Sequence, residues 1–154
     1  MLEQSIPTPA ALVDLEKVEA NTSRMSEKMS RLGAKLRPHV KTHKTVEGAR
    51  LQVRGHFGGI TVSTLAEARH YAKAGFRDIA YAVPVAIPRL EETAELSRSL
   101  AALHLLIDQE ATFREMEACA RAKRLELSAY LKVDCGYHRA GVDPDREESI
   151  GLAR

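Results

Sequence analysis

Short apolar runs alternate with helical segments along almost the whole chain. One apolar residue marks each of six expected strands: Leu12, Leu36, Ile60, Ile79, Leu105 and Leu131. Successive markers lie 24, 24, 19, 26 and 26 residues apart. Regular alternation at this spacing predicts βαβ units and a parallel α/β sheet. A closed (β/α)₈ barrel takes about 250 residues, and the chain has 154. We therefore expect about six β/α units, arranged either as an open sheet or as an incomplete TIM-type barrel.

The expected elements can be placed from their boundary residues. Strands are expected over residues 9–15, 36–41, 59–63, 78–83, 103–107 and 127–133. Helices are expected between them, with Asp14 and Asp108 as N-caps. Thr64 and Glu67 have the spacing of a capping box, in which two side chains satisfy backbone N–H groups at a helix start. A last helical segment is expected from Asp143 onward.

The basic segment LRPHVKTHK, residues 36–44, contains the second expected strand. If that strand is extended, alternation places Arg37, His39 and Lys41 on one face. Such a face can be a solvated surface or the mouth of a barrel, where strand ends deliver catalytic groups. An amine that acts as a nucleophile must be partly unprotonated, and cationic neighbours or burial favour that form. Lys41 is therefore a candidate to form an imine with a carbonyl, although position alone favours a solvated charge.

Composition narrows the class of protein. The chain is 44% hydrophobic and 29% charged, with a formal net charge of +2, which is ordinary for a soluble globular domain. This charge gives no argument for a nucleic-acid or membrane partner, and no apolar run approaches the roughly 20 residues that cross a bilayer. Two cysteines without a CxxC motif, and no signal peptide, predict a reduced cytoplasmic location.

Several motifs together resemble one enzyme family. They are Thr8–Leu15, the segment Arg37–Lys44, Val62–Arg69, and Lys132–Val142, which reads KVDCGYHRAGV. The chain resembles fold type III pyridoxal-phosphate enzymes, which have an alanine-racemase-type barrel. It is most similar to the metal-dependent D-serine dehydratase and D-threonine aldolase group, and Val62–Arg69 favours the dehydratase branch. The resemblance implies that residues 1–154 are the N-terminal part of a pyridoxal-phosphate-binding (β/α)₈ barrel, without its remaining strands and C-terminal β domain.

The resemblance also implies roles for particular residues. Lys41 would hold pyridoxal 5'-phosphate as a Schiff base, and Lys44 would be a surface charge. Arg139 would lie near the phenolic oxygen of the cofactor, and pairing with Asp134 is the structural alternative. His39 would touch the cofactor or tune Lys41, unless it is a satisfied core group.

Two nearby side chains receive weaker assignments. His43 is expected to line the same mouth as Lys41 or to be a satisfied structural group. Arg37 is expected near the opposite end of the barrel, in a structural role.

Metal binding is not expected within these residues. Cys135 and His138 have a spacing that suits a metal, but a zinc site needs three or four ligands. In the resembling enzymes a metal is held near the C-terminus. The resemblance therefore implies a divalent metal, expected to be zinc, in the complete enzyme, with its ligands outside this chain.

The implied activity belongs to the complete enzyme. D-serine would be converted to pyruvate and ammonia, and cleavage of a D-3-hydroxyamino acid, as by D-threonine aldolase, is the alternative. A hypothesis of another class is a non-catalytic pyridoxal-phosphate-binding protein or an inactive fragment. The implied partners are a small D-amino acid and, in the complete enzyme, a second copy forming a homodimer.

Overall fold

A parallel sheet forms the centre of the computed structural model, which describes residues 6–153. The strands are β1 (Ile60–Val62), β2 (Asp78–Pro84), β3 (Ala102–Ile107) and β4 (Ser128–Leu131). Their order in the sheet is β1-β2-β3-β4, and every neighbouring pair is parallel. Each strand therefore lies beside the next one in sequence, as βαβ units require. The parallel α/β sheet is as predicted.

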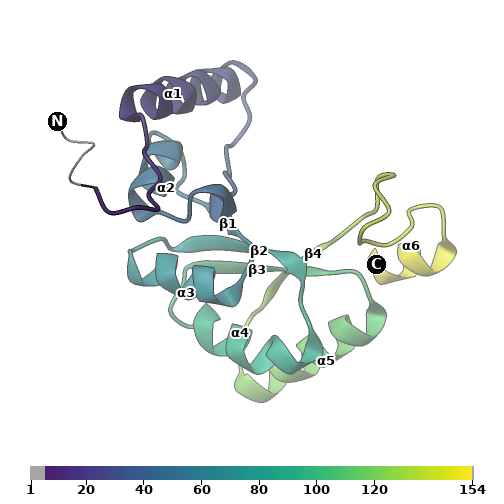
Figure 1. The fold of residues 1–154 in the computed structure, drawn as a ribbon. Helices are drawn as coiled ribbons and strands as arrows, with labels where there is room; N and C mark the ends of the chain where they lie inside the picture. Colours follow the sequence, from purple (N-terminus) through teal and green to yellow (C-terminus); the bar gives the residue numbers. More distant parts are fainter. Residues whose placement is uncertain (1–5, 154) are drawn as a thin grey trace.

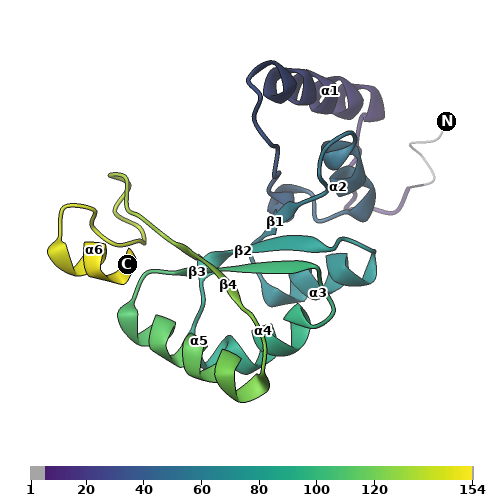
Figure 2. The same cartoon turned by 180° about the vertical axis from the view of Figure 1, so that it is seen from behind.

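Apart from α6 (Glu147–Ala153), which lies by itself near the C-terminus, the helices form two groups (Figures 1 and 2). The other helices are α1 (Leu15–Arg31), α2 (Val46–Val53), α3 (Leu65–Lys73), α4 (Leu90–Ser97) and α5 (Glu110–Lys123), with 3₁₀ turns η2 (Val40–Thr42) and η3 (Ile87–Arg89). Helices α3, α4 and α5 cover one face of the sheet, whereas α1 and α2 lie beyond β1. No helix among residues 6–153 has both the length and the apolar character needed to span a bilayer.

The core lies between the sheet and α3 to α5. In β3, Leu103, Leu105 and Ile107 are buried while the residues between them are less so, as expected when alternate side chains point to opposite faces. Tyr71 of α3 is wholly buried and packs edge-on against Phe76. Burial of such side chains supplies the main favourable free energy of folding.

The other face of the sheet carries polar side chains. Arg37 Nη1 lies 2.6 Å from Asp78 Oδ1, and His104 Nε2 lies 3.3 Å from the same oxygen. His104 Nδ1 contacts Ser128 Oγ at 2.8 Å. Because Asp78 begins β2 and Arg37 also donates to the Ile60 carbonyl, Arg37 lies at the amino end of the strands. Its expected structural role at the end opposite Lys41 is confirmed.

Two expected strands do not form. Residues 9–15 contain no strand within the described part of the chain, and Leu12 and Val13 are 69% and 67% exposed. A strand needs a neighbour for its backbone groups, and no described strand pairs with this segment. The sequence pattern alone could not reveal the missing neighbour.

The second missing strand is residues 36–41, which make a single parallel bridge between His39 and Thr61. Pro38 cannot donate to a ladder, although its carbonyl accepts from the Thr61 N–H. After His39 the chain turns into η2, which includes Lys41. The expectation that Lys41 ends an extended strand is therefore wrong.

Helix caps are mostly as predicted. Asp14 accepts from the Lys17 N–H and caps α1, and Thr64 accepts from the Glu67 N–H and caps α3. The Asp108 cap is wrong, because α5 begins at Glu110 and Asp108 accepts from the Gly141 N–H at 3.3 Å. The carboxylate is used to hold a distant loop instead of a helix start.

We expect the core to be sensitive to truncation of Leu105, which is 0% exposed. Leu105→Ala should lower the free energy of unfolding by about 2–5 kcal/mol, since it removes buried apolar contacts and leaves a cavity. Leu12→Ala, at a 69% exposed position, is the matched control and should change it by less than about 0.5 kcal/mol. Urea unfolding followed by circular dichroism measures both, and equal effects would contradict this placement of the core.

Candidate active site

Lys41 lies on η2, at the carboxyl edge of the sheet. His39 is parallel to Thr61 of β1, so the residues that follow His39 emerge at the same edge as those that follow β1. The turn is well fixed: Val40 is 0% exposed, the His39 ring accepts from the Lys41 N–H at 3.3 Å, and the Lys44 N–H donates to the Val40 carbonyl at 2.9 Å. Lys41 itself is exposed. A rigid, capped turn therefore presents its amine at the rim of the sheet.

His39 joins this turn to the end of β1. Its Nε2 contacts Ser63 Oγ at 3.3 Å, and its Nδ1 receives the Lys41 N–H. Partial burial and the nearby charge of Lys41 hold the pKa of His39 below its ordinary value, against opposing effects of Glu67 and of the Thr61 backbone. The neutral imidazole is therefore favoured beside the Lys41 amine.

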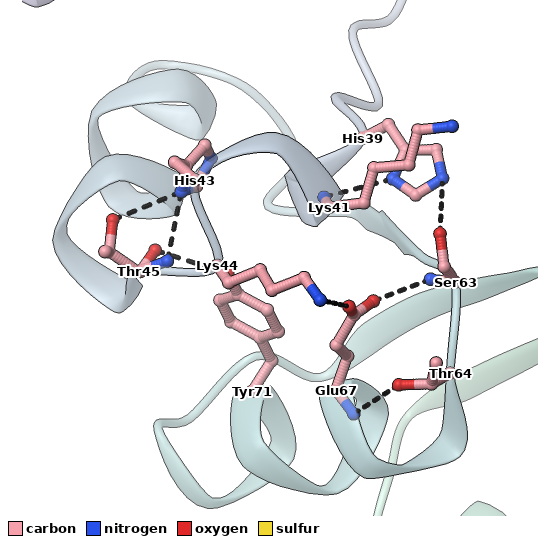
Figure 3. A network of polar contacts seen from close by, with 9 residues as sticks. All are labelled: His39, Lys41, His43, Lys44, Thr45, Ser63, Thr64, Glu67 and Tyr71. Carbon is pink, nitrogen blue, oxygen red and sulfur yellow. Dashed lines mark hydrogen bonds and ion pairs between the residues drawn. The ribbon is translucent and has the colours of Figure 1, made fainter. Parts of the chain in front are cut away.

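The two lysines of the motif have different surroundings (Figure 3). Lys44 Nζ lies 3.2 Å from Glu67 Oε1, and its backbone has a left-handed φ of 54°. Within residues 6–153 the Lys41 amine makes no hydrogen bond or ion pair, and in Figure 3 it extends toward His39, away from Glu67. Of these two lysines, Lys41 therefore has a free amine among the described residues, and the amine of Lys44 is held by a carboxylate.

His43 contacts α2 and not the Lys41 amine. Its Nδ1 lies 3.1 Å from Thr45 Oγ1 and accepts from the Thr45 N–H, and its Nε2 lies 3.0 Å from Gln52 Oε1. One ring nitrogen therefore contacts the N-cap residue of α2, and the other contacts Gln52 near the end of that helix. Of the two roles considered for His43, the structural one agrees with these contacts.

Arg139 lies in the loop that follows β4. Its guanidinium carbon is 5.4 Å from the centre of the Tyr137 ring, a distance that allows a cation–π contact. Parallel strand order brings this loop to the same edge as η2, but among the described residues Arg139 has no hydrogen bond or ion pair with His39 or Lys41.

The alternative that Arg139 pairs with Asp134 is wrong. Asp134 accepts from the backbone N–H groups of His138 and Gly136 and contacts His138 Nδ1, all at 3.0 Å. Led by the His138 backbone bond, these contacts lower the pKa of Asp134. Gly141 completes the loop at φ +117°, where a Cβ would lie 2.6 Å from the Asp134 nitrogen. Arg139 is thus left exposed by a loop that closes without it.

Few side chains in the described part of the chain are placed to bind a metal ion together. Residues 6–153 contain no group of three or more His, Cys, Asp or Glu side chains placed to hold a metal ion. Cys135 is exposed, and His138 is bound to Asp134. A groove of about 430 Å³ lies at the amino edge beside Asp78. It is therefore remote from the edge where Lys41 emerges.

Sequence reasoning missed a second function of Glu67. The spacing from Thr64 predicted a cap for α3, but the carboxylate also receives the Ser63 N–H at 2.8 Å and the Lys44 amine. Its side chain is only 10% exposed. The sequence signal for this role is that one motif contains an acid, Glu67, and another contains a lysine, Lys44. The signal can be used only once η2 and α3 are known to be neighbours.

Comparison with known proteins gives relatives of one kind. A D-serine dehydratase from Dictyostelium discoideum is 36% identical over 157 residues, which cover 96% of this chain and 40% of the relative. A 3-hydroxy-D-aspartate aldolase from Paracoccus denitrificans is 29% identical over 156 residues, covering 100% and 40%. This chain therefore spans well under half the length of these relatives.

A solved structure agrees closely with the fold. The D-threo-3-hydroxyaspartate dehydratase from Delftia sp. HT23 superposes with a TM-score of 0.90 at 37% identity, over 96% of this chain and 39% of that one. A variant of that dehydratase is described in a metal-free form. Residues 13–153 match the family described as alanine racemase, N-terminal domain. The chain therefore belongs to the alanine racemase N-terminal domain family.

Proposed function

We propose that this chain supplies the cofactor lysine of a pyridoxal-phosphate-dependent lyase acting on D-amino acids, with D-serine dehydration as the reaction. The observation that carries the proposal is the free Lys41 amine on a capped turn at the carboxyl edge of a parallel sheet. That edge is where enzymes of barrel type place reacting groups. The dehydratases among the relatives support the choice of reaction.

The residues at this edge fit an aldehyde cofactor. Lys41 offers the primary amine that an aldehyde requires, and His39 offers a neutral imidazole beside it. Arg139, an exposed cation on the β4 loop, would face the phenolic oxygen. When bound, pyridoxal phosphate withdraws electrons from the substrate Cα. The contributions of this chain are to hold the amine on a rigid turn and to supply polar groups around it.

The proposed reaction needs groups beyond these three. D-serine loses its α-proton and its β-hydroxyl as water, and hydrolysis of the resulting enamine gives pyruvate and ammonia. Residues 1–154 would form the N-terminal part of a (β/α)₈ barrel, and the polar face carrying Asp78 and His104 would point into it. A divalent metal, proposed to be zinc, would assist departure of the hydroxyl and would be held outside this chain. A homodimer and a cytoplasmic location are part of the same proposal.

Aldol cleavage of a D-3-hydroxyamino acid is the second candidate, favoured by the aldolase relative that matches the full chain. Both reactions begin from the same lysine, and they differ in whether a Cα–H or the Cα–Cβ bond breaks. A non-catalytic pyridoxal-phosphate-binding protein is the alternative of another class. It would use Lys41 without changing a D-amino acid.

Lys41 should be the residue that captures the cofactor. Pyridoxal phosphate added to the chain should produce a visible absorption band, and borohydride reduction should attach the label to the peptide containing Lys41. Lys41→Ala should abolish this label, because no other free amine occupies η2, whereas Lys35→Ala, at an exposed position upstream, should leave it unchanged. Label located on Lys44 in the unaltered chain would contradict the assignment.

The reaction class should follow from the products. In the whole protein loaded with pyridoxal phosphate, D-serine should yield pyruvate and ammonia in equal amounts, and Lys41→Ala should remove this activity. Lactate dehydrogenase coupled to NADH oxidation measures the pyruvate. Glycine and an aldehyde formed from D-threonine would instead identify an aldolase, and binding without either product would identify the non-catalytic alternative.

His39 should report the charge of Lys41. Lys41→Gln should raise the pKa of His39 and Glu67→Gln should lower it further, since the first removes a nearby positive charge and the second a negative one. Histidine ring NMR against pH measures this, with His39→Gln identifying the signal. Because the pKa of His39 is lower in the folded state than in the unfolded chain, acid favours the unfolded chain, which binds the proton more readily. The contribution of His39 to the free energy of unfolding is therefore present above the unfolded pKa and is lost as pH falls through the folded pKa. If the pKa of His39 does not change in Lys41→Gln, the two side chains do not lie in one site.

A further inference from the structure

Glu67 holds Lys44, one of the two lysines in the Arg37–Lys44 segment, whereas the other, Lys41, lies within η2. Its Oε1 lies 3.2 Å from Lys44 Nζ, and its Oε2 accepts the Ser63 N–H at 2.8 Å (Figure 3). The backbone of Glu67 is itself fixed, since its N–H donates to Thr64 Oγ1 at 3.0 Å. The carboxylate thus connects Ser63, which follows β1, to Lys44, which lies two residues after η2.

This ion pair differs from an ordinary surface pair at its acidic partner. The Glu67 side chain is 10% exposed, whereas that of Lys44 is 64% exposed. Burial acts to raise the pKa of Glu67, but the Ser63 N–H and the Lys44 amine outweigh it and hold that pKa below the ordinary value. The carboxylate is therefore charged and fixed in place at neutral pH, ready to hold a cation.

The backbone also directs Lys44 toward Glu67. Lys44 has a φ of 54°, a left-handed conformation that costs free energy in a residue other than glycine. This conformation turns the chain from η2 into α2, and the Lys44 N–H closes the turn on the Val40 carbonyl. In Figure 3 the side chains of Lys41 and Lys44 consequently extend in different directions.

We propose that Glu67 is a positioning residue that selects Lys41 as the imine-forming amine by binding Lys44. The inference rests on the proposed function and adds a specificity determinant to the same site. In imine formation a neutral amine nitrogen attacks the aldehyde carbon, a C–N bond forms, and the carbonyl oxygen leaves as water. The ion pair binds the ammonium form of Lys44, so attack by this lysine requires the pair to break and a proton to leave. Lys41 has no such contact to lose.

Limited reductive methylation tests the selection without the cofactor. The full chain is treated with a small amount of formaldehyde and cyanoborohydride, which reduces the imine by hydride transfer, and peptide mass spectrometry gives the Lys44:Lys41 labelling ratio. Lys41 should dominate in the unaltered chain. Glu67→Gln should raise the ratio about two- to five-fold, the range expected for losing one partly exposed ion pair. Glu47→Gln, a nearby acid on α2, is the matched control and should leave the ratio unchanged.

Salt provides a readout that does not depend on folding of a variant. Ionic strength near 1 M reduces the Debye length to about 3 Å and weakens exposed charge pairs. The Lys44:Lys41 ratio of the unaltered chain should therefore rise with salt, whereas that of Glu67→Gln should not. The selection by Glu67 is overturned if the ratio in the unaltered chain does not change with salt. It is also overturned if Glu47→Gln raises the ratio at low salt as much as Glu67→Gln does.

A parallel arm with pyridoxal phosphate and borohydride separates the two proposals. A Glu67-dependent ratio with formaldehyde, together with no pyridoxal-phosphate label on any variant, would overturn the proposed function and leave the control of Lys44 by Glu67 standing. Pyridoxal phosphate confined to Lys41 in both the unaltered chain and Glu67→Gln, with an unchanged formaldehyde ratio, would overturn the selection and leave the proposed function standing.

Discussion

Parallel pairing is the constraint on which the rest of this structure depends. Strands β1 to β4 all run in one direction, and His39 pairs with β1 in the same direction. The carboxyl ends of all these segments therefore lie at one edge of the sheet. Residues far apart in sequence, such as Lys41, Ser63 and the 134–142 loop, are brought to that edge without any direct bond between them. The helices on the apolar face keep the sheet rigid, so groups at its edge hold their places.

The two faces of the sheet have different chemistry, and this bears on its wider context. The face toward α3 to α5 is apolar and buried, whereas the other carries Asp78, which contacts both Arg37 and His104. When the members of a polar network satisfy one another, enclosing the network costs less than enclosing unpaired polar groups. The arrangement therefore agrees with the interior of a barrel, the architecture that the resemblance implies, while the free edge of β4 within the described residues shows where another strand could pair.

Sequence reasoning succeeded where local pattern determines structure and failed where a partner determines it. The strands around Ile60, Ile79, Leu105 and Leu131 were predicted because each is an apolar run between helix signals. Residues 9–15 and 36–41 have similar patterns, but strand formation requires a neighbour that no pattern reveals. The Asp108 cap and the Arg139–Asp134 pair failed for a related reason. Both carboxylates bond instead to the 136–141 loop, whose course depends on tertiary structure.

In the candidate site, too, local pattern predicts which residues are present, and tertiary contacts determine how their atoms are placed. The motif around residue 41 presents two lysines three positions apart, and resemblance alone ranks them. The fold adds a physical difference, because a partly buried carboxylate from α3 holds one amine and the 3₁₀ turn directs the other away from it. An extended strand would have continued the pairing of His39 with β1 through Lys41. The turn that the sequence pattern did not predict instead leaves Lys41 exposed at the edge of the sheet.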